Sequence, residues 1–185
     1  MHVSDDRFGA WVCGDRHLMA VRPDTLSGLP IGVKDVIATR DFPTRCGTDL
    51  PQAVIQALLE KGEADCVSDL KQAGAVVAGK TVTAELATYQ PGNTVNPLSV
   101  TRSPGGSSSG SAAAVAAGDV RLALATQTAG STIRPASYCG LYGFKPSFGR
   151  YTLAGVLATS PTLDTLGMIA DELGFIQAAD RALTD

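Results

Sequence analysis

The sequence has little net charge, few histidines and no long apolar run, and each shortage excludes a class of function. Its 185 residues carry 15 Lys and Arg against 18 Asp and Glu, a formal charge of −3, so no strong field would attract nucleic acid or an anionic membrane. The longest run of small residues, 112–118, is far shorter than the ~20 apolar residues that span a bilayer. We therefore predict a protein that binds neither nucleic acid nor a membrane.

Metal-binding patterns are also scarce. The only histidines are His2 and His17, and the cysteines lie far apart with no CxxC pair, which argues against a zinc site. Residues 5–7 are charged where a secretory signal would need an apolar run, so we predict a cytoplasmic protein whose cysteines are reduced thiols. The four cysteines are Cys13, Cys46, Cys66 and Cys139.

The remaining composition is that of a folded domain. Hydrophobic residues make up 44% of the chain and charged residues 18%, well away from the regime of disorder. A chain of this length buries roughly 70% of the surface that its unfolded form exposes, enough for one domain and tight for two. The 20 glycines exceed the usual share of ~7%, so parts of the backbone must adopt conformations that side chains would obstruct.

The apolar pattern predicts alternating helices and strands. Residues 64–73 repeat apolar side chains at three-residue spacing and end before Gly74, which is typical of an amphipathic helix with a glycine C-cap. The continuous apolar run 75–78 then indicates a buried strand, and a helix followed by a buried strand indicates an α/β layer structure. Further expected elements are strands at 11–12, 31–38 and 122–128, an apolar piece at 138–144, helices at 83–88 and 111–117, and loops over the rest of 1–28 and over 89–106.

A dense run of glycine and serine occupies residues 104–111. One interpretation is a flexible linker, although a small-residue helix is expected directly after it. A second is a phosphate cradle at a helix N-terminus, but the run lacks the Lys-Ser/Thr ending of the P-loop and the spaced glycines of the dinucleotide fingerprint. The third is a catalytic serine in a tight turn, where the helix N-terminus stabilises negative charge.

Lys34 interrupts the apolar run at 31–38. As a structural residue it would pair with Asp35 or extend its amine to the surface. As a general base it must be neutral, so its pKa must fall from ~10.4 to about 7, which takes about 4 kcal/mol and a buried site. Lysine is the better base for a serine nucleophile here, because both histidines lie within the first 17 residues.

A third segment, residues 126–136, places small residues directly before Ser131. It is either an ordinary turn with a hydroxyl cap or a turn whose backbone N–H groups stabilise a developing oxyanion, each donor being typically worth ~3–4 kcal/mol. Any one of the three segments is a weak signal. Their joint presence is much more specific and favours nucleophilic catalysis by serine.

Several motifs, in this order along the chain, resemble those of the amidase signature family. The resemblance covers about residues 28–170, and the leader at 1–27 is similar to that of short-leader amidases related to plant indole-acetamide hydrolases. The motifs are GVKD at 32–35, AVVAGKT at 75–81, GGSSSGS at 105–111 and GSTIRPA at 130–136, with further matches at 138–140, 143–146 and 160–167.

The resemblance implies a Ser-cis-Ser-Lys triad and no metal or organic cofactor. Lys34 would be the base, Ser107 the bridging serine after a cis peptide, and Ser131 the nucleophile. The two serines are 24 positions apart, as the family pattern leads one to expect. The oxyanion hole would be formed by the backbone of Thr128, Ala129, Gly130 and Ser131, with support from Ser108, Ser109 and Arg134.

The same resemblance predicts an α/β fold with a mixed central β-sheet flanked by helices. We expect one amidase-signature domain over residues 1–185, incomplete on its C-terminal side because family members are considerably longer. The expected reaction is hydrolysis of a linear, small-molecule carboxamide to a carboxylic acid and ammonia or an amine. Two alternatives stay open: a truncated fragment that is inactive or needs a complementing polypeptide, and an amidotransferase A-type subunit that hydrolyses glutamine. A homo-oligomer is a further open prediction.

Two residues depart from the family pattern beside the nucleophile. Many members have an acidic residue and two glycines before the serine, whereas this chain has Gln127, Ala129 and Gly130. These departures change the charge and the contacts around the turn that carries Ser131.

Overall fold

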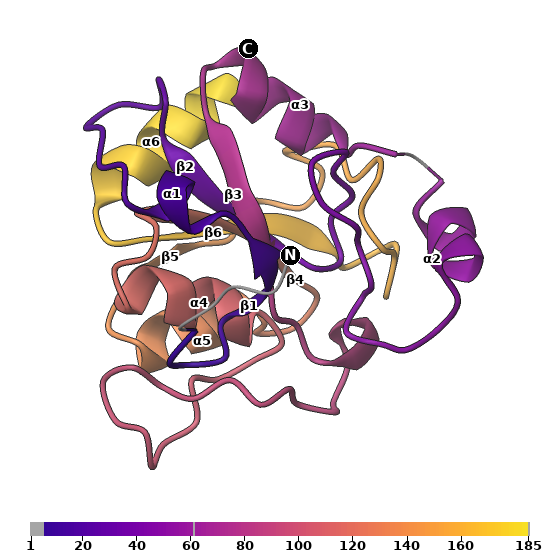
Figure 1. Cartoon of the computed structure of the whole chain (residues 1–185). Helices are drawn as coiled ribbons and strands as arrows, with labels where there is room; N and C mark the ends of the chain where they lie inside the picture. Colours follow the sequence, from indigo (N-terminus) through magenta and orange to yellow (C-terminus); the bar gives the residue numbers. More distant parts are fainter. Residues whose placement is uncertain (1–5, 61, 185) are drawn as a thin grey trace.

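A mixed β-sheet forms the centre of the computed structural model, which describes residues 6–60 and 62–184. Its strands are β1 (Trp11–Gly14), β2 (Pro30–Lys34), β3 (Val76–Thr81), β4 (Leu122–Gln127), β5 (Tyr142–Phe144) and β6 (Thr165–Ala170). They lie in the order β1-β3-β2-β4-β6-β5 (Figure 1). β2 is parallel to β3 and β4, and the other neighbours pair antiparallel, so the mixed sheet that the motifs predicted is confirmed.

Helices cover both faces of the sheet. α4 and α5 lie on one face, and α3 and α6 lie on the other, while α2 stands to one side (Figure 1). In chain order the helices are α1 (Arg16–Met19), α2 (Gln52–Leu59), α3 (Asp65–Gln72), the 3-10 turn η1 (Glu85–Ala87), α4 (Ser109–Ala116), α5 (Ile133–Tyr138) and α6 (Leu173–Ala182).

The alternation of side chains along β4 divides the core between these layers. Leu122 and Leu124 pack into the main core on the side of α3 and α6, whereas Ala123 faces α4. The α4 side is built from small residues, and Gly110 shows why. A Cβ at Gly110 would lie 2.2 Å from the backbone nitrogen of Val82, so only glycine allows this approach of helix to strand. The close approach carries the serine loop to the end of the sheet.

The predicted helix at 64–73 is confirmed as α3, and Gly74 follows it with a φ of +98°. The strand expected at 75–78 exists as β3 but begins at Val76 and runs on to Thr81. The helix expected at 111–117 begins two residues earlier, so Ser109 belongs to it. At 83–88 the chain forms only the 3-10 turn η1, because Leu86 and Ala87 have positive φ angles that an α-helix does not admit.

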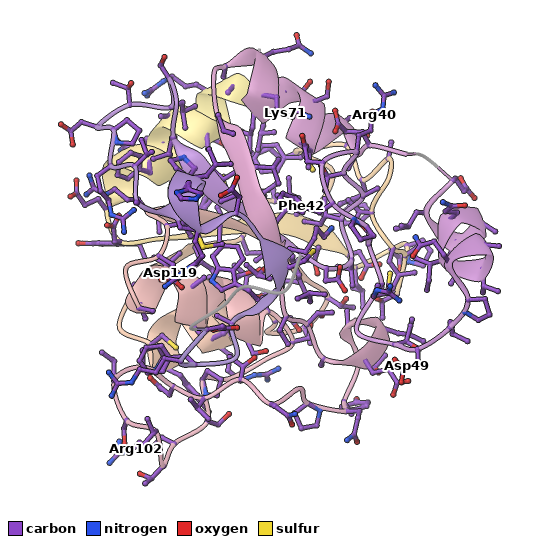
Figure 2. All side chains as sticks on the ribbon, viewed as in Figure 1. Arg40, Phe42, Asp49, Lys71, Arg102 and Asp119 are labelled. Carbon is purple, nitrogen blue, oxygen red and sulfur yellow. The ribbon has the colours of Figure 1, made fainter. Side chains whose placement is uncertain are left out.

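The leader is more structured than expected. Asp119, labelled in Figure 2, accepts hydrogen bonds from Trp11 Nε1 at 2.8 Å and from Arg16 Nη1 at 3.1 Å, which tie β1 and α1 to the end of α4. Residues 1–5 of the predicted leader, with His2 among them, lie outside the described residues.

The four cysteines are buried and unpaired, as predicted for free thiols, and burial raises the pKa of each. Among the described residues, no helix is both long and apolar enough to cross a bilayer.

Candidate active site

Lys34 is the last residue of β2, and its side chain is completely buried. The Nζ amine donates hydrogen bonds to Ser107 Oγ at 2.8 Å and to Thr126 Oγ1 at 2.7 Å. The structure therefore brings together the predicted base and the predicted bridging serine from positions 73 residues apart. Thr126, near the end of β4, completes the amine's surroundings, a role that the sequence did not reveal.

The surroundings of Lys34 favour a neutral amine. Burial lowers the pKa of Lys34 to about 7, and the negative charge of Asp164 opposes this shift. Both direct partners are hydroxyls, which accept from an N–H and can also donate to a free amine. The simpler structural interpretation, pairing with Asp35, is wrong, because the carboxylate of Asp35 lies 3.9 Å from the amine of Lys80 instead.

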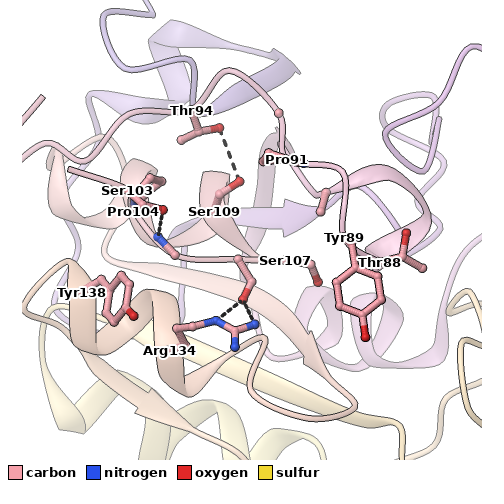
Figure 3. A pocket seen from close by; sticks show the side chains of 14 residues that line it. Thr88, Tyr89, Pro91, Thr94, Ser103, Pro104, Ser107, Ser109, Arg134 and Tyr138 are labelled. Atoms are coloured by element: carbon pink, nitrogen blue, oxygen red, sulfur yellow. Dashed lines mark hydrogen bonds between the residues drawn. The ribbon is translucent and has the colours of Figure 1, made fainter. Parts of the chain in front are cut away.

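The loop before α4 holds Ser107 beneath a surface cavity. The Gly106-Ser107 peptide is cis, as the family resemblance implied. Gly105 has a φ of +79°, and a Cβ there would come within 2.9 Å of Pro135 Cα, so this turn needs glycine. Arg134 on α5 donates from Nε at 3.1 Å and from Nη2 at 2.8 Å to the carbonyl oxygen of Gly106 (Figure 3). Arg134 thus fastens the serine loop to the helix that follows Ser131.

Backbone contacts place the Ser131 turn against the same loop. The N–H of Ser108 donates to the carbonyl of Ser131 at 3.3 Å, and Ser108 Oγ donates to the carbonyl of Thr126 at 3.4 Å. Ser109 Oγ reaches Thr94 Oγ1 at 3.4 Å, which links the start of α4 to the loop above it (Figure 3). Ser108 and Ser109 therefore connect the serine loop to the chain segments on either side of it.

The turn between β4 and α5 presents unused backbone donors. Within residues 6–60 and 62–184, the N–H groups of Ala129, Gly130 and Ser131 donate to no protein acceptor. Consecutive free N–H groups beside a nucleophile are what an oxyanion hole requires. The hydroxyl of Thr128, the first residue of this turn, donates to the carboxylate of Asp164.

Asp164 anchors this turn to the chain segment before β6. Besides the hydroxyl of Thr128, its carboxylate accepts the N–H groups of Thr159 and Ser160, each at 2.7 Å. The residue is 7% exposed, so its charge acts on Lys34 through protein and not through water.

A cavity of about 420 Å³ opens above Ser107. In Figure 3, Tyr89 and Tyr138 lie on opposite sides of Ser107 and Arg134. The wall is otherwise made of small, hydroxyl and proline side chains, and Arg134 is the one charged residue among those that line it. Its size suits a small organic ligand. Arg102 extends at the tip of the 89–106 loop, away from the body of the molecule (Figure 2).

The chemistry available here belongs to serine and lysine. In the part of the chain that the structure describes, no group of three or more His, Cys, Asp or Glu side chains is arranged to hold a metal ion. A buried amine that is hydrogen-bonded to a serine can accept a proton. The free N–H groups beside the second serine, in the adjoining turn, can stabilise an oxyanion.

Known proteins resemble this chain over most of its length. A family model described as Amidase matches residues 15–184. The A-type subunit of glutamyl-tRNA(Gln) amidotransferase from Anaeromyxobacter dehalogenans is 37% identical over 94% of this chain. That match covers 38% of the relative's own length, so the chain spans well under half of this curated protein.

Solved structures of amidase-family proteins share the fold of this chain. The A-type subunit of glutamyl-tRNA(Gln) amidotransferase from Thermotoga maritima is similar with a TM-score of 0.80 and 31% identity, over 98% of this chain and 40% of that one. The peptide amidase from Stenotrophomonas maltophilia has a TM-score of 0.81 and 29% identity, over 97% of this chain and 40% of that one.

Proposed function

The chain belongs to the amidase family, as its motifs predicted, and we propose that Lys34, Ser107 and Ser131 are the catalytic triad of an amide hydrolase. The observation that carries the proposal is the Lys34 amine, which is wholly buried, bonded to Ser107 and held by hydroxyls. A charged structural lysine would instead be expected beside a carboxylate.

The proposed reaction begins with a proton relay. Neutral Lys34 accepts the proton of Ser107, Ser107 accepts that of Ser131, and Ser131 Oγ attacks the carbon of the carboxamide. The developing oxyanion is stabilised by the free N–H groups at residues 129–131. The relay then returns the proton to the leaving nitrogen, the C–N bond breaks, and an acyl ester remains on Ser131. Water cleaves this ester through the same relay.

Labelling with a serine-directed fluorophosphonate, followed by peptide mapping, tests this proposal. We expect covalent modification of Ser131 that disappears in Ser131→Ala and in Lys34→Ala. Modification of Ser107 in place of Ser131 would exchange the two serine roles. A folded protein that takes up no label would contradict the proposal.

The curated relatives favour the glutamine-hydrolysing alternative over a free-standing hydrolase of linear amides, because their names describe the A-type component of an amidotransferase. In this second proposal the amide is the side chain of glutamine, and the ammonia released is used by a partner subunit. Glutaminase assays with and without a co-expressed partner separate the two. Hydrolysis of simple amides by the isolated chain, with no stimulation by a partner, would favour the free-standing enzyme.

The domain organisation, the location and the partner of the chain are further parts of the proposal. We propose one domain over residues 1–185, with 1–27 as its leader, acting in the cytoplasm on a small-molecule amide. A complementing polypeptide or a second copy of the chain would complete the substrate pocket. Analytical ultracentrifugation of labelled protein tests this, because an active monomer would make such a partner unnecessary.

A further inference from the structure

The side chain of Gln127 spans the turn that carries Ser131. From the end of β4, its Oε1 accepts the N–H groups of Thr132 at 2.9 Å and Ile133 at 3.0 Å, at the start of α5. Its Nε2 donates to the carbonyl of Ala129 at 3.0 Å. The residue is 7% exposed, so these bonds form almost out of contact with water. One side chain therefore holds the turn at both ends.

The orientation of this amide is dictated by its neighbours. Two backbone donors face one side of the Gln127 amide and a carbonyl faces the other. A reversed amide would set its NH₂ group against two N–H groups and its oxygen against a carbonyl oxygen. The observed orientation is the one that satisfies all three backbone groups.

The bond to Ala129 fixes a donor of the proposed oxyanion hole. The carbonyl of Ala129 and the N–H of Gly130 belong to one planar trans peptide, in which they point in opposite directions. When Gln127 Nε2 holds the carbonyl on one side, the Gly130 N–H is aimed to the other side. That N–H donates to no acceptor in the described protein, so it stays available to a ligand.

We propose that Gln127 is a positioning residue that aims the Gly130 N–H at the oxyanion through the Ala129-Gly130 peptide. The inference rests on the proposed function and deepens it. An acidic residue, which many family members have at this position, accepts the bonds at the start of α5 equally well. It has no proton to donate to Ala129 when ionised, so this chain holds its oxyanion turn by a bond that a carboxylate does not make.

Gln127→Glu tests the proposal with the smallest change of shape. We expect the maximal rate of fluorophosphonate labelling at Ser131 to fall by about 10- to 100-fold, because one oxyanion donor is misaligned. The probe concentration giving half-maximal rate should change less than about 3-fold. The melting temperature should fall, because a carboxylate oxygen then faces the carbonyl oxygen of Ala129, but less than in Gln127→Met, since the acceptor at the start of α5 is retained. Gln127→Met, which loses both kinds of bond, should lower both the rate and the melting temperature.

Gln52→Glu is the matched control. Gln52 on α2 also donates from Nε2 to a backbone carbonyl, that of Thr44 at 3.1 Å, away from the serines. The labelling rate of the Gln52→Glu variant should equal that of the wild type. Wild-type labelling rates in Gln127→Glu, with Ser131 still modified, would overturn this inference alone. Absence of labelling in the wild-type protein would overturn the proposed function and this inference together.

Discussion

Lys34 on β2 and Lys80 on β3 are both fully buried, yet their amines meet opposite kinds of neighbour. The Lys80 amine donates hydrogen bonds to the carbonyl of Ile37 and to Thr44 Oγ1, the latter at 2.9 Å. The same amine lies 3.9 Å from a carboxylate oxygen of Asp35. Lys34 donates to two hydroxyls and has no carboxylate within ion-pair distance among the described residues.

The same burial therefore has different consequences at the two sites. Burial lowers the pKa of Lys80 to about 8 and raises that of Asp35, while the attraction between the two charges opposes both shifts. At Lys34 burial lowers the pKa to about 7. A carbonyl and a carboxylate can only accept hydrogen bonds and so favour an ammonium, whereas a hydroxyl can accept from an ammonium or donate to a neutral amine.

The sheet keeps the two environments apart. Lys80 is in register with Val33, and successive residues of a strand point to opposite faces, so Lys34 and Lys80 leave the sheet on different sides. The comparison teaches that burial alone does not make a lysine a base. We expect the partners to decide which of the two amines loses its proton more readily, because the carboxylate of Asp35 favours the charged form of Lys80, whereas Lys34 meets two hydroxyls.

Removing the Lys34 amine should have the largest effect on reactivity. In Lys34→Met we expect labelling of Ser131 to fall by about 10³-fold or more, because the relay loses its base. The free energy of unfolding at neutral pH should rise, because the variant no longer carries the cost of burying an amine whose pKa the fold lowers to about 7. Stopped-time labelling and denaturant unfolding measure the two quantities.

The pH dependence of this variant has a definite sign. The folded protein holds Lys34 at a pKa of about 7 against 10.5 when unfolded, so the unfolded chain binds more protons between these values. Lys34 destabilises the fold most below pH 7, and this penalty disappears as the pH rises towards 10.5. An advantage of Lys34→Met that grew with rising pH would contradict the account.

Removing the Lys80 amine should lower the free energy of unfolding and leave the labelling rate of the folded protein nearly unchanged. Lys80→Met removes the ion-pair partner of the buried carboxylate of Asp35, which should cost about 3–5 kcal/mol of unfolding free energy. The labelling rate of the folded fraction should stay within about 3-fold of the wild type. Lys80→Met/Asp35→Asn should recover part of the lost stability. A Lys80→Met protein that is as stable as the wild type but does not react with the probe would contradict the different roles assigned to the two lysines.

Thr126→Val should have the smallest effect. It removes one hydroxyl from the Lys34 amine at nearly constant volume. The midpoint of the pH profile of labelling should move to lower pH, because the ammonium loses an acceptor. The plateau rate above this midpoint should fall by about 10-fold, because the amine loses one of the two contacts that hold it. A midpoint displaced to higher pH would show that Thr126 does not stabilise the charged form.

Lys34, Ser107 and Ser131 could be proposed from the sequence because each lies within a short contiguous motif. Partners from distant segments could not be predicted in this way. Asp35 is the sequence neighbour of Lys34, yet it pairs with Lys80, which is 45 residues further along the chain. The sequence places Thr126 only within the segment 126–136, since its contact with Lys34 depends on the pairing of β2 with β4.

The missed helices α2 and α6 lack local start signals. α2 follows Pro51 and α6 follows Glu172, and neither residue makes a side-chain cap bond. β6 is buried along its whole length. Half of it lies within the motif at 160–167, which from the sequence alone is interpreted as a family motif and not as a strand. Tertiary packing against β4 and β5 stabilises this strand.

Titration of the lysine side chains by NMR tests the central claim most directly. In protein labelled with ¹³C at the lysine ε-carbons, the resonance of Lys34 is assigned by its loss in Lys34→Met, and that of Lys80 by its loss in Lys80→Met. We predict that Lys34 titrates with a pKa of about 7 and Lys80 with a higher value, about 8. A Lys34 resonance that remains that of an ammonium until pH ~10 would contradict the account, because the proposed relay would then have no base.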